Sequence, residues 1–144
     1  METGGLSDPY DLRRFVAAQD PVFETVCAEL ADGRKRSHWM WFVFPQVQGL
    51  GRSEMARRYA ISSLDEARAY VRHPILGPRL KHVCALAARA PAASAAEIFG
   101  PIDAVKFRSC LTLFTWAAPE ETIFRACLDR FFDGQADPLT LSHL

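Results

Sequence analysis

Cations, an imidazole and two indoles follow one another early in the chain, in the run Arg34-Lys35-Arg36-Ser37-His38-Trp39-Met40-Trp41. Guanidinium and ammonium groups bind phosphate, and an indole face stacks on a base or another ring. This combination is typical of a site for a nucleotide or a phosphorylated sugar. The simpler alternative is a solvated basic turn that leads into a core helix, and residue types alone favour that alternative.

A second polar set surrounds a Gly-x-Gly loop that precedes a helix expected to start at Ser53. Free N–H groups and the positive end of a helix dipole attract anions. The loop lacks the third glycine and the preceding βαβ pattern of a dinucleotide fingerprint, so a loop that merely needs glycine conformations is the simpler interpretation. The candidate binding residues of this segment are Gln46, Gly49, Gly51, Ser53, Arg57 and Tyr59.

A third polar set lies on an otherwise apolar helix, where Asp103, Lys106, Ser109 and Thr112 follow one another at steps of three. A lysine on a buried helix is costly unless it is paired or faces a wet cleft. Asp103 is a local partner for Lys106. The other interpretation is that Lys106 points into a pocket and binds an anion, and the sequence leaves both open.

The remaining reactive residue types give weaker signals. The histidines His38, His73, His82 and His143 lack metal-site spacing, and the chain has no P-loop and no G-x-S-x-G motif. We therefore expect no metal and no cofactor. The cysteines are isolated in apolar stretches, which predicts buried free thiols in a reducing cytosol; they are Cys27, Cys84, Cys110 and Cys127.

Composition predicts one domain with a substantial core, because 144 residues carry 49% apolar side chains, ten of them Phe. The 17 basic and 17 acidic residues balance, which argues against general nucleic-acid binding. Local RNA binding by the basic residues of 34–36 and 57–58 is a weaker alternative. The N-terminus does not resemble a signal peptide, and the longest apolar run, 39–44, is far shorter than the ~20 residues of a membrane span. We therefore expect a cytoplasmic protein without a membrane partner.

Helix signals recur along the chain, and they predict an all-α single domain over residues 8–144. Start signals are Asp8-Pro9, Asp20-Pro21, Ser53, Ser63 with Glu66, and Ser94 with Glu97. Stop signals are Gly33, Pro74, Gly100 and Gly134. About seven or eight helices should pack around a central apolar helix at about 102–117. Residues 1–7 are expected to form a flexible tail.

Two segments are harder to interpret. The run 39–44 fits either a short helix or a buried strand, and the lack of a partner strand favours the helix. The tail 135–144 is expected to dock back on the domain through Leu139, Leu141 and Leu144.

Several long blocks make the chain similar to one family. These blocks are 37–46, 49–51, 59–61, 66–70, 73–77, 98–100 with Asp103, and 106–114. Together they resemble the domain-of-unknown-function family 1810, whose members are sometimes labelled calpastatin. The resemblance extends from about Asp8 to the C-terminus, with Cys110 where the family suggests Ser and Val43 where it suggests Ile. It implies a helical fold and a bacterial-type cytoplasmic protein. A calpastatin-type inhibitor repeat is disordered and poor in core residues, so the label implies no activity for this chain.

The family blocks coincide with all three polar sets, and we therefore expect a pocket for a small anionic ligand, nucleotide-like or ADP-ribose-like. His38 is the candidate acid–base group and Lys106 the candidate for holding charge that develops on a substrate. The candidate binding residues are Trp39, Trp41, Gln46, Gly49, Gly51, Ser53, Arg57, Tyr59, Ser109 and Thr112. The alternative is a non-catalytic protein-interaction module that uses exposed aromatic side chains near 39–44.

Overall fold

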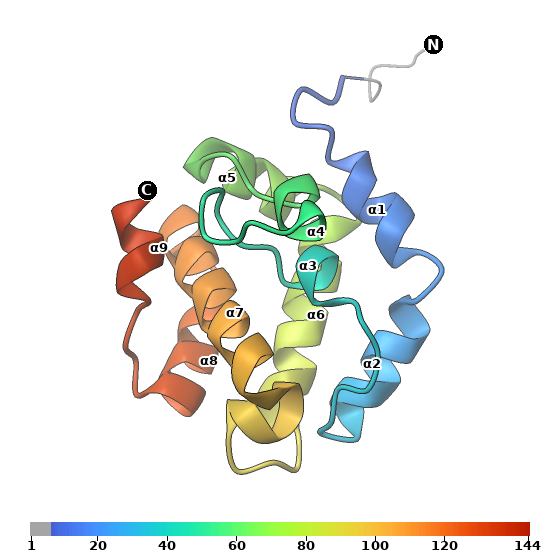
Figure 1. Ribbon diagram of the computed structural model, residues 1–144, viewed down its shortest axis with the longest axis vertical. Helices are drawn as coiled ribbons and strands as arrows, with labels where there is room; N and C mark the ends of the chain where they lie inside the picture. Colours follow the sequence, from blue (N-terminus) through green and yellow to red (C-terminus); the bar gives the residue numbers. More distant parts are fainter. Residues whose placement is uncertain (1–6) are drawn as a thin grey trace.

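This computed structural model describes residues 7–144, and this part of the chain contains nine α helices (Figure 1). They are α1 (Arg13–Gln19), α2 (Phe23–Ala31), α3 (Met40–Val43), α4 (Glu54–Arg58), α5 (Leu64–Arg72), α6 (Leu76–Arg89), α7 (Ala95–Ala117), α8 (Thr122–Phe132) and α9 (Pro138–Ser142). This range contains no strand, and one isolated bridge joins Val47 to Ile61. No helix in it is long and apolar enough to cross a bilayer. The all-α prediction is confirmed, whereas the expected tail lies outside the described residues apart from Ser7.

The longest helix, α7, forms the centre of the domain. Helices α5, α8 and α9 pack against it, while α2, α5 and α8 pack against α6. In Figure 1 the blue N-terminal helices lie on one side of the molecule and the red C-terminal helices on the other. The middle of α7 is buried, as predicted, through Phe107, Cys110, Leu111, Leu113 and Phe114. Ile102 and Val105, which follow the break at Gly100, are exposed, and so is Trp116 near the C-terminal end of α7.

Three of the predicted helix starts are formed by hydroxyl caps, whereas Asp20 does not cap α2, which begins after Val22 without a side-chain cap. Ser53, Ser63 and Ser94 each accept a hydrogen bond from the N–H group three residues later. At Gly100 a left-handed φ of 82° interrupts α7, as the sequence predicted for a stop at this position. Helix α1 begins later than expected, because the Asp8 carboxylate accepts the N–H groups of Leu12 and Arg13 across an intervening turn.

The aromatic run 39–44 forms the short helix α3, which confirms the helical interpretation. Its side chains do not form an exposed contact patch, and that expectation is wrong. Trp39, Phe42 and Phe44 are buried, and the Phe44 ring packs edge-on against the ring of Phe107 at 5.0 Å between centroids. Burial of this large aromatic area stabilises the core instead of offering a surface to a partner. Trp41 alone of these four aromatic side chains is half-buried.

The tail docks on α7, but through different residues from those expected. Leu139, Leu141 and Leu144 are exposed by 65%, 37% and 39%, whereas Asp137 and Thr140 are buried. Polar contacts therefore anchor the tail, which apolar patterning alone does not reveal. The cysteine prediction is confirmed for Cys84, Cys110 and Cys127, which are buried free thiols, while Cys27 is a free thiol that is only half-buried.

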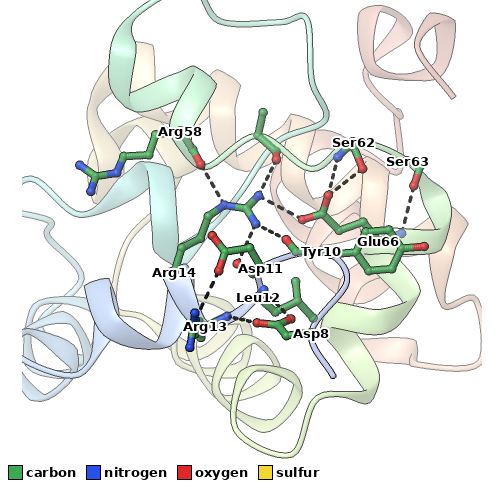
Figure 2. A network of polar contacts seen from close by, with 11 residues as sticks. Asp8, Tyr10, Asp11, Leu12, Arg13, Arg14, Arg58, Ser62, Ser63 and Glu66 are labelled. Carbon is green, nitrogen blue, oxygen red and sulfur yellow. Dashed lines mark hydrogen bonds and ion pairs between the residues drawn. The ribbon is translucent and has the colours of Figure 1, made fainter. Parts of the chain in front are cut away.

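The guanidinium of Arg14 ties three separate segments together (Figure 2). It donates hydrogen bonds to four backbone carbonyls and to the carboxylate of Glu66, 3.1 Å away. The carbonyls belong to Tyr10, Asp11, Arg58 and Ala60. Glu66 in turn accepts the N–H and O–H groups of Ser62 at 2.9 and 2.8 Å. The N-terminal segment, the loop after α4 and helix α5 are thereby fixed relative to one another.

We expect Arg14→Ala to lower the free energy of unfolding by about 3 kcal/mol, because it leaves the nearly buried Glu66 carboxylate without its cation. The neighbouring Arg13 is a matched control, since its side chain is 87% exposed. Arg13→Ala should change the stability by less than about 0.5 kcal/mol. Urea denaturation of both variants measures the difference, and equal stabilities would show that the network contributes nothing.

Candidate functional site

The buried carboxylate of Glu29 on α2 holds the basic segment, residues 34–41, in place through hydrogen bonds. It accepts hydrogen bonds from the N–H groups of Arg36 and Ser37 at 2.8 and 3.1 Å. It also accepts the Ser37 hydroxyl at 2.7 Å and the indole N–H of Trp39 at 2.9 Å. Burial alone would raise the pKa of Glu29, but these four hydrogen bonds outweigh it and lower the pKa to about 2. Glu29 thus binds the segment through neutral N–H and O–H groups, and the cationic side chains of the segment remain available to other partners.

The cation of Lys35 finds its partner on α7. Its ammonium lies 3.0 Å from the Asp103 carboxylate, and the Lys106 ammonium lies 3.4 Å from the same group. The side chains of Lys35, Asp103 and Lys106 are 9%, 19% and 26% exposed. Two ammonium groups therefore share one carboxylate in a partly buried setting. One positive charge of this Lys35–Asp103–Lys106 cluster is left without a counterion among the three.

Each lysine of the cluster also lies over an indole. The Lys35 ammonium is 5.2 Å from the centre of the Trp39 ring, and the Lys106 ammonium is 5.2 Å from that of Trp41. Both distances are within the range of a cation–π contact. The structure thus brings together Lys106 and Trp41, two residues that the sequence singled out from distant segments.

A hollow of about 550 Å³ adjoins the cluster at Lys35. One wall is the loop after α2, and the other is formed by the α6–α7 connection and the first turn of α7; together they comprise residues 32–35, 91–92 and 96–100. Gly100 stands at the edge of open space, since a Cβ atom there would have no neighbour within 4 Å. Lys35 belongs to both the hollow and the cluster, so a ligand in the hollow would be next to the cluster's charge.

Three further candidates, His38, Trp39 and Gln46, differ in accessibility. His38 is exposed, whereas Trp39 is buried and committed to Glu29. Gln46 is half-buried, and its backbone carbonyl accepts the N–H of Ile61 at 2.9 Å. Across residues 7–144, no group of three or more His, Cys, Asp or Glu side chains could hold a metal ion.

Packing or helix capping accounts for four of the candidates around the Gly-x-Gly loop, namely Gly49, Gly51, Ser53 and Tyr59. Gly49 has a φ of 101°, and a Cβ there would lie 2.8 Å from the His143 ring. At Gly51 a Cβ would lie 2.6 Å from the Cβ of Ala56. The hydroxyl of Ser53 is the cap of α4, a helix of only five residues. Tyr59 is buried against the rings of Phe15 and Phe42, and Arg57 is exposed. None of the contacts described for these residues involves Lys106.

The four residues of the third polar set, all on α7, make two different kinds of contact. Asp103 and Lys106 face the basic segment, whereas Ser109 and Thr112 anchor the tail. The Ser109 hydroxyl donates to the buried Asp137 carboxylate at 3.0 Å, and the Thr112 hydroxyl accepts the Asp137 N–H at 2.9 Å. Burial raises the pKa of Asp137, but hydrogen bonds from Thr140 and Ser109 bring it below its ordinary value. These two hydroxyls therefore already form hydrogen bonds within the protein and are not available to a ligand.

Three residues with important contacts were missed or not singled out from the sequence: Glu29, Lys35 and Asp137. Glu29 had a signal, because it lies between Val26 and Leu30 on the apolar face of α2, where a charge needs a reason. Lys35 was visible only as a member of a basic triplet, since its partner Asp103 is far away in the chain. Asp137 had a local signal as a helix cap, because Pro138 follows it as prolines follow Asp8 and Asp20, but nothing local indicates that its carboxylate is buried.

Known proteins match nearly the whole chain. The family model described as "Protein of unknown function (DUF1810)" matches residues 9–144, which confirms the resemblance drawn from the sequence blocks. The chain is also similar to the conserved hypothetical protein Rv1873 from Mycobacterium tuberculosis, whose crystal structure was solved at 1.38 Å. The identity is 50% and the TM-score 0.93, with 95% of this chain and 98% of that chain covered. No curated protein matches the chain.

We expect Glu29 to make the protein acid-sensitive. Its pKa is lower in the folded chain, so its stabilising contribution is complete above the ordinary pKa of 4.5 and is lost as the pH falls toward about 2. This contribution is on the order of 3 kcal/mol. Glu29→Gln should therefore be less stable than the parent chain at pH 7, with the difference shrinking between those two pH values. The exposed Glu24 on the same helix gives the control Glu24→Gln, whose stability curve should run parallel to the parent's in denaturant titrations.

Proposed function

This chain belongs to the DUF1810 family of proteins of unknown function, and from that premise we propose that it binds a small anionic ligand at the Lys35–Asp103–Lys106 cluster. The observation that carries the proposal is the shared carboxylate, which leaves one partly buried positive charge uncompensated. The ligand is nucleotide-like or ADP-ribose-like, because a phosphate offsets that charge while a flat ring can stack on the half-buried Trp41.

The partial burial of the cluster strengthens its electrostatic attraction for an added anion. A phosphate beside a partly buried ammonium is screened less by solvent than one at an exposed lysine. The most buried of the three side chains, Lys35, fixes the position of Asp103, and the more exposed Lys106 is the ammonium that contacts the ligand. The hollow beside Lys35 provides room for the part of the ligand that does not stack on Trp41.

His38 is the residue that we propose for acid–base chemistry on a bound ligand. It is exposed, and it directly precedes the indole that Glu29 holds in place. Imidazole is the side chain best suited to exchange protons near neutral pH. Ser109 and Thr112 are left out of this proposal, because their hydroxyls bind Asp137 and Arg108 within the fold.

The test is calorimetric titration at low salt with AMP and ADP-ribose, with adenosine as the uncharged reference. We expect Lys106→Met to weaken binding of the two anions by about tenfold, since one close charge–charge contact is worth roughly 1–4 kcal/mol. Asp103→Asn should strengthen it, because it removes the competing carboxylate and leaves both ammonium groups uncompensated. The matched control is Lys81→Met, as Lys81 is also half-exposed and paired, but with Glu121 on another part of the surface.

Three results would contradict the proposal. The first is absence of binding by both anions. The second is equal loss of affinity in Lys106→Met and Lys81→Met. The third is binding that requires an RNA strand and falls steeply with salt, as expected when many phosphates are neutralised. A further control, Ser109→Ala, should lower the free energy of unfolding by about 1 kcal/mol and leave the ligand affinity unchanged.

A further inference from the structure

Three hollows away from the Lys35–Asp103–Lys106 cluster lie next to one another over α5 and the end of α7. The first, of about 460 Å³, is lined by Tyr10, Asp65, Arg68, Ala69, Arg72 and His73. The second, of about 290 Å³, lies between Arg68, Val71 and Arg72 of α5 and the segment 116–120. The third, of about 290 Å³, is lined by Thr115, Trp116, Pro119 and Arg125. Arg68 and Arg72 belong to the first two hollows, and Trp116 and Pro119 to the last two, so the hollows adjoin one another, and together they are called the α5–α7 groove.

We propose that this α5–α7 groove binds an extended peptide segment that carries an acidic residue next to an apolar or aromatic one. Arg72 and Trp116 carry the proposal, because both line the middle hollow. Among residues 7–144, the Arg72 guanidinium makes no hydrogen bond or ion pair, and the Trp116 side chain is 44% exposed. A free guanidinium binds a carboxylate through two parallel hydrogen bonds, and an exposed indole face covers an apolar side chain.

The other arginines of the groove have internal tasks. Arg68 donates to the carbonyl of Ala117 at 3.3 Å and pairs with Asp65 at 3.2 Å. Arg125 pairs with Asp129 at 3.4 Å. Within residues 7–144, Arg72 is thus the arginine of this groove whose guanidinium N–H groups have no protein partner and can bind a ligand. The ligand's acidic group is expected there, with its apolar neighbour on Trp116.

The length of the groove favours an extended chain over a compact metabolite. Asp65, Arg68, Ala69 and Arg72 lie along one face of α5, which spans roughly 10 Å at 1.5 Å per residue. The groove then continues through two more hollows. An extended peptide advances roughly 3.3 Å per residue, so a segment of about six residues would fill it. A single-stranded nucleic acid also binds arginine and aromatic residues, but it carries a phosphate on every nucleotide. Asp65 and Glu120, which line the groove, would therefore repel it more strongly than a peptide whose few carboxylates can lie beside Arg72.

The walls of the groove are fixed before any ligand arrives. Figure 2 shows the carbonyl of Tyr10 held by Arg14 and the start of α5 held by the Ser62, Ser63 and Glu66 contacts. Arg68 holds the C-terminal end of α7 against α5. A preformed groove reduces the entropy that a flexible peptide has to lose on binding.

The test is a titration of the ¹⁵N-labelled full chain with the hexapeptide acetyl-Ala-Asp-Leu-Asp-Trp-Ala-amide, followed by NMR. We expect the Trp116 indole N–H signal to shift at submillimolar peptide. The variants Arg72→Gln and Trp116→Ala should each weaken binding by about tenfold, and so should a peptide with Asn in place of Asp. Arg89→Gln is the matched control, because Arg89 is exposed in the last turn of α6 and outside the groove. All three substitutions are at exposed side chains, and retained backbone spectra verify the fold.

Each of three outcomes would overturn the inference. No shift at Trp116 with millimolar peptide rules out the groove as a peptide site. Indole-3-acetate that binds as tightly as the peptide shows that the ligand is a free aromatic acid. An oligothymidine strand that binds more tightly than the peptide, and is lost in Arg72→Gln, shows a nucleic-acid groove instead.

Discussion

Three buried carboxylates hold the irregular parts of this domain in place. The stretch between α2 and α5 and the tail after α8 have little regular structure, so their backbone groups need partners wherever they are buried. An unsatisfied buried polar group costs about 1–3 kcal/mol. Glu29 binds the segment 36–39, Glu66 binds Ser62 and Arg14, and Asp137 binds Ser109 and Thr140. The helices supply a frame, and these three side chains attach the loops to it.

The carboxylates differ in their donors, and this difference decides where charge reaches the surface. Glu66 is neutralised by Arg14, whereas Glu29 accepts only neutral N–H and O–H groups. The cation of Lys35, which lies next to the segment that Glu29 organises, is therefore not used there and pairs with Asp103. Since Lys106 pairs with the same carboxylate, the local charge is uneven although the whole chain is neutral. The uncompensated charge of the candidate site is thus a consequence of how the basic segment is anchored.

Local chemistry could be predicted from the sequence, and long-range pairing could not. Hydroxyl caps such as Ser53 and the stop at Gly100 depend on a few neighbouring residues, so their patterns were sufficient. The pairing of Asp103 with Lys106 was also visible as a local alternative. The second partner, Lys35, was not, because nothing in a single sequence relates α7 to a loop after α2. The tail was misjudged for a related reason: apolar periodicity identified its leucines, whereas the buried contacts are made by Asp137 and Thr140.

The two proposed sites both depend on α7 and yet are electrically independent. Lys106 belongs to the first site and Trp116 to the second, and ten residues of helix separate them by roughly 15 Å. This distance exceeds the Debye length of about 8 Å at physiological ionic strength, so an anion at one site exerts little direct force on an anion at the other. The zero net charge of the chain also provides no long-range attraction for either ligand. Affinity at each site therefore has to come from contacts made after encounter. At the first site these are made by the Lys106 ammonium and an indole near the middle of α7, and at the second by the Arg72 guanidinium and an indole near the C-terminal end of α7. Any coupling between them has to pass through the packing of α7 itself, in which residues 109–114 between the two sites are all buried.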